Sequence, residues 1–81
     1  MARSAPTSRY ASLGRVLRSE REAAGLTQAQ LASVLGWSQP VIAEVESARR
    51  GLNIFEFIDY ARVLNRDPTD LFRAVTEADR G

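Results

Sequence analysis

Residues 25–47, GLTQAQLASVLGWSQPVIAEVES, predict two short helices joined by a tight turn. Thr27 opens the first helix with the pattern Thr-x-x-Gln, which is typical of a capping box at a helix N-terminus. Gly36 ends that helix, because glycine readily adopts the left-handed conformation found just past a helix C-terminus. Ser38 caps the second helix, and Pro40 lies in its first turn, where a missing backbone N–H costs nothing. Two short capped helices around a glycine turn form the geometric core of a helix-turn-helix.

One helix before this pair and two after it are also predicted. Apolar residues spaced three and four positions apart indicate an amphipathic helix that runs from Arg9 to a stop at Gly25. Asn53 caps a fourth helix and Asp67 a fifth, since both side chains accept hydrogen bonds from free backbone N–H groups. The apolar positions of the first helix are Tyr10, Leu13, Val16, Leu17 and Ala24. Those of the fourth are Ile54, Phe57, Ile58, Ala61 and Leu64, and those of the fifth are Leu71, Phe72 and Val75. Because strand signals are missing, the sequence predicts an all-α domain of five helices.

The length of 81 residues suits a single small domain. We expect a disordered arm over residues 1–8, because they are mostly small and polar and include Pro6. The helical domain is expected over residues 9–75, followed by a polar, frayed tail over residues 76–81.

The last two helices carry more apolar side chains than so small a domain buries well. A chain of this length buries only about 60% of its unfolded surface, so covering more apolar area by dimerisation would add stability. We expect Phe55, Phe72 and Val75 to form a homodimer surface.

The composition excludes several classes of protein. The sequence has no cysteine and no histidine, which removes disulfides, thiolate metal sites, and the commonest general base and metal ligand. It shows no glycine-rich phosphate cradle and no acid pair in an evident pocket, so we expect neither an enzyme nor a metal or cofactor site. No apolar run approaches the ~20 residues of a membrane span, and the N-terminus lacks the apolar stretch of a signal peptide. We therefore expect a cytoplasmic protein without a membrane partner.

The second helix of the pair, Ser38–Ser47, presents side chains that suit a nucleic acid. Its apolar residues form one stripe, and Ser38, Gln39, Ala43 and Glu44 lie on the outer face. Serine and glutamine hydrogen-bond base edges, alanine can touch the thymine methyl group, and glutamate can accept from cytosine N4. A short amphipathic helix with a polar N-terminal half is suited to enter the DNA major groove. Glu44 is equally compatible with a solvated surface acid.

The net charge of +1, from 11 arginines and 10 acidic residues, is weak support for a nucleic-acid partner. All basic residues are arginine, whose guanidinium suits bidentate contacts with phosphate and guanine. The location of the charges therefore matters more than their sum.

Two segments of the chain together resemble the Cro/repressor-like, XRE-type helix-turn-helix family. They are LGRVLRSEREAAGLTQAQLASVLGWSQPVIAEVES (residues 13–47) and IFEFIDYARVLNRDPTDLF (residues 54–72). The resemblance implies a five-helix, lambda-repressor-like DNA-binding domain whose second and third helices form the helix-turn-helix. It also implies a transcriptional regulator that binds double-stranded DNA of specific sequence on the nucleoid, with Ser38–Ser47 in the major groove. Such regulators usually act as a homodimer on a palindromic operator.

The resemblance also assigns roles to single residues. Those expected to contact DNA phosphates are Gln28, Ser47, Arg49 and Arg50. Arg21 and Glu46 match an internal ion pair between the first and third helices. The sequence departs from the family pattern at Trp37, where a smaller aliphatic residue is usual, and at Pro40, where many members carry a base-reading side chain. Ala48 stands in place of the usual glycine after the third helix.

A second interpretation is a protein-binding module that keeps this fold, such as an antitoxin or an anti-activator that acts through a regulatory protein partner. The near-neutral charge, Glu44 and the exposed aromatic side chains favour it. DNA affinity and its salt dependence distinguish the two interpretations, because neutralising phosphates gives a steep dependence on salt.

Overall fold

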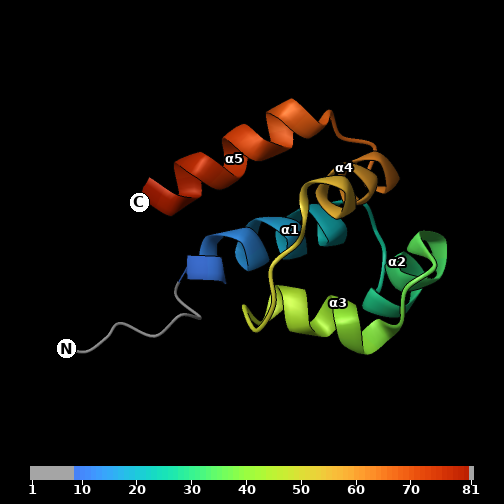
Figure 1. Ribbon diagram of the computed structural model, residues 1–81. Helices are drawn as coiled ribbons and strands as arrows, with labels where there is room; N and C mark the ends of the chain where they lie inside the picture. The colour runs from blue at the N-terminus through green and yellow to red at the C-terminus, as the bar shows by residue number, and fades with distance from the viewer. Residues whose placement is uncertain (1–8, 81) are drawn as a thin grey trace.

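The computed structural model describes residues 9–80, which form five helices and no strand (Figure 1). The helices are α1 (Ala11–Ala23), α2 (Gln28–Leu35), α3 (Gln39–Glu46), α4 (Ile54–Val63) and α5 (Pro68–Arg80). The prediction of an all-α domain with five helices is confirmed. The arm predicted over residues 1–8 lies outside the described residues.

The last helix is longer than predicted. α5 continues through Arg80, so the prediction of a frayed tail beyond residue 75 was wrong for residues 76–80. α5 packs against α1, and the Ser12 hydroxyl donates a hydrogen bond to Asp79 across this contact (Oγ to Oδ1, 3.1 Å). Val75 packs against the core and Ala78 is half-buried. Tertiary packing of one face stabilises a helix whose overall composition is polar, which is why composition alone was misleading here.

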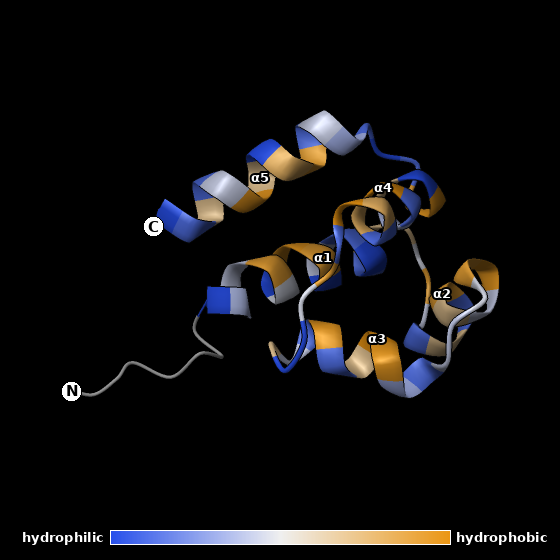
Figure 2. Cartoon of the chain, in the orientation of Figure 1, coloured by the Kyte–Doolittle hydropathy of each residue, from blue (hydrophilic) through white to orange (hydrophobic). Residues whose placement is uncertain are grey.

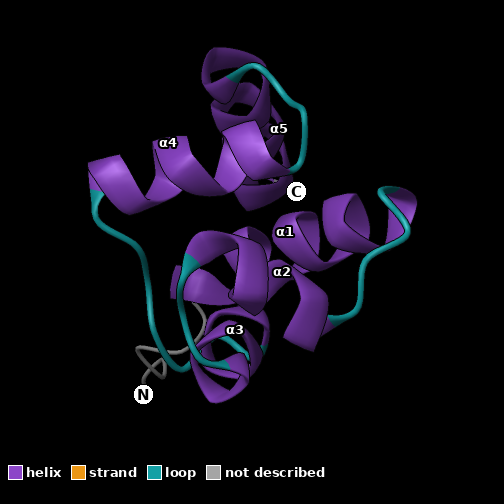
Figure 3. Cartoon of the chain, turned by 90° about the vertical axis from the view of Figure 1, so that its right-hand side faces the viewer, coloured by secondary structure: helices purple, strands orange, loops and turns teal. Residues whose placement is uncertain are grey.

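α1 occupies the middle of the molecule, between α3 on one side and α5 on the other (Figures 1 and 3). α2 packs against α3 and α4, and α4 packs against α5. Apolar and polar stretches alternate along each helix, as expected for amphipathic helices around one core (Figure 2). The buried apolar residues are Leu17, Leu31, Ala32, Ile42, Val45, Phe57, Tyr60, Ala61, Leu64 and Leu71. This arrangement buries one side of α3 and leaves the other side open.

Local capping decides where the helices begin. Thr27 and Asn53 each form a complete capping box, with reciprocal hydrogen bonds between the N-cap residue and the third helical residue. Ser38 is the N-cap residue of α3, but its side chain makes no capping hydrogen bond. The reason lies in the first turn, where Pro40 has no N–H and the N–H of Val41 already donates to the Ser38 carbonyl oxygen at 3.1 Å.

Apolar spacing predicted only part of the buried face of α1. Leu13, Val16 and Leu17 pack in or against the core, but Tyr10 and Ala24 are exposed. The buried residues of α1 are Ser12, Gly14, Leu17 and Arg21. Gly14 lies where α1 crosses the C-terminal end of α3, and a Cβ atom there would lie 2.7 Å from the carbonyl oxygen of Glu46 and 2.8 Å from that of Val45. Both distances are shorter than real Cβ contacts. The missing side chain of Gly14 therefore sets how closely α1 and α3 approach.

Candidate nucleic-acid interface

A tight turn holds α2 and α3 together as one unit. Gly36 takes the left-handed conformation with φ 76°, and the backbone N–H of Trp37 donates to the Ala32 carbonyl oxygen at 2.8 Å. The half-buried Trp37 meets the ring of Tyr60 edge-on, with ring centroids 5.8 Å apart. Burial raises the pKa of the Tyr60 hydroxyl, which has no hydrogen-bond partner among the described residues. Trp37 thus fastens the turn to α4.

The open side of α3 carries the residues predicted to contact bases. Ser38, Gln39 and Glu44 are exposed, and Ala43 is half-buried. Pro40 is exposed beside them. Ser47, at the C-terminal end, is also exposed, and its hydroxyl donates to the carbonyl oxygen of Glu44 at 3.3 Å. These side chains all belong to one eight-residue helix and its two cap residues.

A buried ion pair ties α1 to the last turn of α3. Arg21 donates from Nε to Glu46 Oε2 at 2.6 Å and from Nη2 to Glu46 Oε1 at 3.0 Å. Its Nη1 donates to the carbonyl oxygen of Leu26 at 2.8 Å. The two side chains are only 10% and 4% exposed, and the hydrogen bonds to Glu46 raise the pKa of Arg21. The pair that the sequence predicted therefore also holds the segment that leads into α2.

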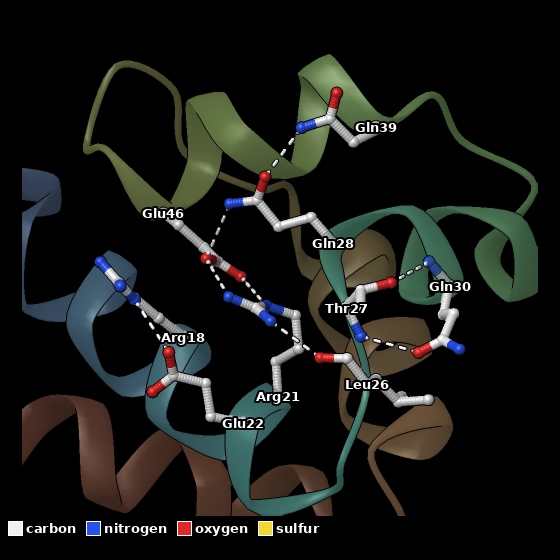
Figure 4. A network of polar contacts seen from close by, with 9 residues as sticks. All are labelled: Arg18, Arg21, Glu22, Leu26, Thr27, Gln28, Gln30, Gln39 and Glu46. Carbon is white, nitrogen blue, oxygen red and sulfur yellow. Dashed lines mark hydrogen bonds and ion pairs between the residues drawn. The ribbon is translucent and has the colours of Figure 1, made fainter.

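Two glutamine side chains extend this ion pair to the protein surface (Figure 4). Gln28 donates from Nε2 to Glu46 Oε1 at 3.1 Å, and Gln39 donates from Nε2 to Gln28 Oε1 at 2.8 Å. The amide of Gln28, predicted to contact a phosphate, is thus hydrogen-bonded at both ends within the protein. This network could not be predicted from residue spacing, because its partners lie 18 and 11 residues apart. One signal was present: a glutamine opens both α2 and α3.

The two arginines in the loop after α3 were predicted to have the same role, but their surroundings differ. Ala48 takes the left-handed conformation with φ 66° that a glycine adopts more easily. Arg49 is exposed and has no side-chain partner among the described residues. Arg50, in contrast, donates from Nη2 to Glu56 Oε2 at 3.1 Å, and its guanidinium lies 5.9 Å from the centroid of Trp37. Arg50 holds the loop against α4, while Arg49 remains accessible.

A second exposed surface is apolar and is formed by α4 and α5. Ile54, Phe55 and Phe72 are 62%, 74% and 56% exposed, and Val75 is half-buried. Ile54, Phe57 and Phe72 line two grooves of about 650 and 290 Å³, and Val75 lines the larger of the two. Phe57 and Phe72 meet edge-on, with ring centroids 6.3 Å apart. We call this region the α4–α5 surface.

Neither a metal cluster nor a membrane-spanning helix is found in the described part of the chain. Between residues 9 and 80, no three acidic side chains are grouped so that they could hold a metal ion. No helix of this range is long and apolar enough to cross a membrane.

Comparison with known proteins gives a consistent family and fold. The sequence model of a family described as "Helix-turn-helix domain" matches residues 12–74. No curated protein sequence matches the chain. An XRE-family like protein from Pseudomonas syringae pathovar tomato has a similar structure, with 38% identity, a TM-score of 0.75, and coverage of 85% of this chain and 84% of that one.

Two crystal structures of the clp gene regulator ClgR from Corynebacterium glutamicum share the fold. One has 22% identity and a TM-score of 0.81, and the match covers 88% of this chain and 76% of that one. The other has 23% identity and a TM-score of 0.78, and the match covers 85% of this chain and 90% of that one.

Proposed function

This chain belongs to the helix-turn-helix domain family and is XRE-like, and we propose that it is a sequence-specific DNA-binding regulator of transcription. The main support is the open polar side of α3. Its opposite side packs in the core and its last turn is held by the Arg21–Glu46 pair, so the polar side is presented to solvent in a fixed orientation. An α-helix with its side chains is about 10–12 Å across and the major groove is about 12 Å wide, so α3 fits the groove. The protein would act in the cytoplasm, on the nucleoid.

Base recognition is assigned to the first turns of α3. Gln39 is exposed and keeps its Oε1 and one N–H of Nε2 for a base, a pattern that matches the edge of adenine. Ser38 has no capping bond to its own helix, so its hydroxyl is available to a base. Ala43 suits a thymine methyl group and Glu44 suits cytosine N4.

Backbone contact is assigned chiefly to Arg49. Its exposed guanidinium follows α3 directly, near the place where the DNA backbone would pass. Ser47 can add a hydroxyl contact, and the N-terminus of α2 at Gln28 can offer backbone N–H groups to a phosphate. Arg50 has a different part in this proposal: its contacts with Glu56 and Trp37 keep the loop in place.

Two substitutions are expected to separate base recognition from backbone binding. Gln39→Ala should cost roughly 1–3 kcal/mol on the preferred operator and change the affinity for random duplex little. Arg49→Ala should weaken binding to both duplexes alike and lower the slope of log K against log salt by about one unit. Binding measured on both duplexes at several salt concentrations, after selection of the operator from random DNA, tests both expectations.

Arg73→Ala is the matched control, because Arg73 is an arginine with a 63% exposed side chain on α5, away from α3. It should leave affinity and salt slope unchanged. Should the parent protein show no affinity for any duplex, the proposed function is refuted. Variants at Gln39 and Arg49 that bind DNA like the parent would refute the assigned interface.

We further propose that the protein is a homodimer on a palindromic operator, joined through the α4–α5 surface. Phe72 lines both apolar grooves and Phe55 is largely exposed on α4, so a second copy related by a twofold axis could cover both side chains. Covering such large exposed aromatic side chains is favourable at roughly 25 cal/mol per Å² of apolar area. The two α3 helices would then contact half-sites about 10 base pairs apart.

Phe55→Glu is expected to convert the dimer to a monomer without unfolding it, because the Phe55 side chain is largely exposed and a charge there would oppose burial in an interface. Sedimentation at tens of micromolar, with circular dichroism as the control for folding, measures this. A parent protein that sediments as a monomer both free and on DNA would contradict the dimer.

The second candidate is a protein-binding module that acts through a regulatory partner such as a toxin or an activator. The apolar α4–α5 surface favours it, since a partner protein could cover the same groove. The salt-dependent DNA binding described above distinguishes this candidate from the proposed function.

A further inference from the structure

The chain of contacts Arg21–Glu46–Gln28–Gln39 fixes the direction of every hydrogen bond within it. A carboxylate accepts hydrogen bonds and donates none. Both oxygens of Glu46 accept from Arg21, and Oε1 also accepts from Gln28. The amide of Gln28 therefore turns its NH₂ group toward Glu46, which leaves its oxygen facing Gln39. Gln39 in turn directs its NH₂ group toward Gln28 and its oxygen outward (Figure 4).

We infer that Glu46 is a positioning residue for base recognition, because it sets which atoms Gln39 presents to DNA. This inference rests on the proposed function and adds the buried residue that makes Gln39 select adenine. With one N–H used by Gln28, the amide of Gln39 offers one acceptor and one donor. Adenine presents a matching acceptor and donor at N7 and N6. Guanine presents two acceptors, N7 and O6, one of which would face the Gln39 oxygen.

Burial makes the direction of these bonds rigid. The Glu46 side chain is 4% exposed and is held by Arg21 through two hydrogen bonds, so it cannot turn away. Rotating the Gln28 amide would place its oxygen against Glu46 Oε1, so that two acceptors would face each other and the Gln28 oxygen would have no donor beside a buried carboxylate. Gln39 is exposed, and without Gln28 its amide would turn freely in solvent.

Glu46→Gln is expected to allow the chain to reverse. Arg21 donates to both oxygens of Glu46, so either orientation of the new amide opposes one Arg21 N–H and the two orientations become comparable. In one of them the NH₂ group takes the place of Oε1 and donates to Gln28 instead of accepting from it. Gln28 would then direct its own NH₂ group to Gln39, whose oxygen would turn inward. Gln39 would present N–H groups alone, which is the pattern that guanine accepts. We expect the parent to prefer adenine over guanine by about 5- to 150-fold at this base, and the variant to lower that ratio about 10-fold or more.

The test compares duplexes that differ only at the base pair where Gln39→Ala loses discrimination. The readout is the ratio of the affinities for adenine and guanine, because loss of folded protein lowers both affinities equally. Gln28→Ala is the second variant. It breaks the chain but keeps the Arg21–Glu46 pair, so it tests whether Gln28 links Glu46 to Gln39 even if Glu46→Gln does not fold. It should abolish the adenine preference without favouring guanine.

Glu22→Gln is the matched control, because it removes the same charge from a 56% exposed side chain that pairs only with Arg18 among the described residues. It should leave the ratio unchanged. An unchanged ratio in both Glu46→Gln and Gln28→Ala, or a guanine preference in the parent, would overturn the inference while DNA binding, and with it the proposed function, persists. A parent that binds no duplex would instead refute both.

Discussion

Replacing Arg21 by alanine should lower the free energy of unfolding by about 3–5 kcal/mol. The substitution leaves the carboxylate of Glu46 buried, at 4% exposure, without the guanidinium that compensates its charge. It also removes the donor to the carbonyl oxygen of Leu26. The stability of a whole domain is only about 5–15 kcal/mol, so the loss would be a large part of the total. Glu46→Ala should cost a similar amount, because it strands the Arg21 charge instead.

Urea denaturation followed by circular dichroism measures this loss. Arg18→Ala is the matched control on the same helix, since Arg18 pairs with Glu22 at 3.2 Å in an i,i+4 contact whose side chains are 64% and 56% exposed. Such exposed helix pairs contribute only about 0.3–0.5 kcal/mol. Equal losses in the Arg18 and Arg21 variants would show that the Arg21–Glu46 pair does not stabilise the fold as a buried ion pair.

Gly14→Val is expected to lower the free energy of unfolding by about 3 kcal/mol or more. A Cβ atom at this position would meet the carbonyl oxygens of Glu46 and Val45 at 2.7 and 2.8 Å. Those atoms belong to the backbone of α3, which cannot move aside as a flexible side chain would. α1 and α3 must then separate, which also disturbs the nearby Arg21–Glu46 contact.

Gly14→Ala tests whether a small side chain at this position raises or lowers the free energy of unfolding. Helix propensity alone favours alanine over glycine by about 1 kcal/mol, whereas the close contact with α3 opposes any side chain. We expect the unfavourable contact to outweigh the gain in helix propensity, so the variant should be less stable than the parent. Ser19→Val, at an exposed position of α1, is the control and should change stability by no more than about 0.5 kcal/mol. A Gly14→Ala protein more stable than the parent would show that α1 and α3 have room to adjust.

The boundaries of the central helices could be predicted because capping is local. The two partners of each capping box, at Thr27 and at Asn53, lie three residues apart in the sequence. Gly36 ends α2 through its own φ, which needs no distant contact. The open side of α3 follows from the same local periodicity, since burying Ile42 and Val45 leaves the opposite side to solvent.

The errors arose where distant contacts override local patterns. The tail looks polar, but α5 continues to Arg80 because it packs on α1, where Ser12 and Asp79 bond across 67 residues of sequence. The phosphate contact of Arg50 stays a prediction, to which the structure adds an ion pair with Glu56, six residues further along the chain.

The sequence alone predicted the five helices, the helix-turn-helix and the outer face of α3, because each depends on groups within about one helical turn. Only the tertiary structure shows which partner each polar side chain binds. It also shows why position 14 is a glycine, because the backbone of α3 lies where a side chain would be. It brings Glu46 beside Gln28 and Gln28 beside Gln39, and these contacts dictate which way each amide points. A residue name states how many donors and acceptors a side chain has, but their direction depends on neighbours that helix packing brings together.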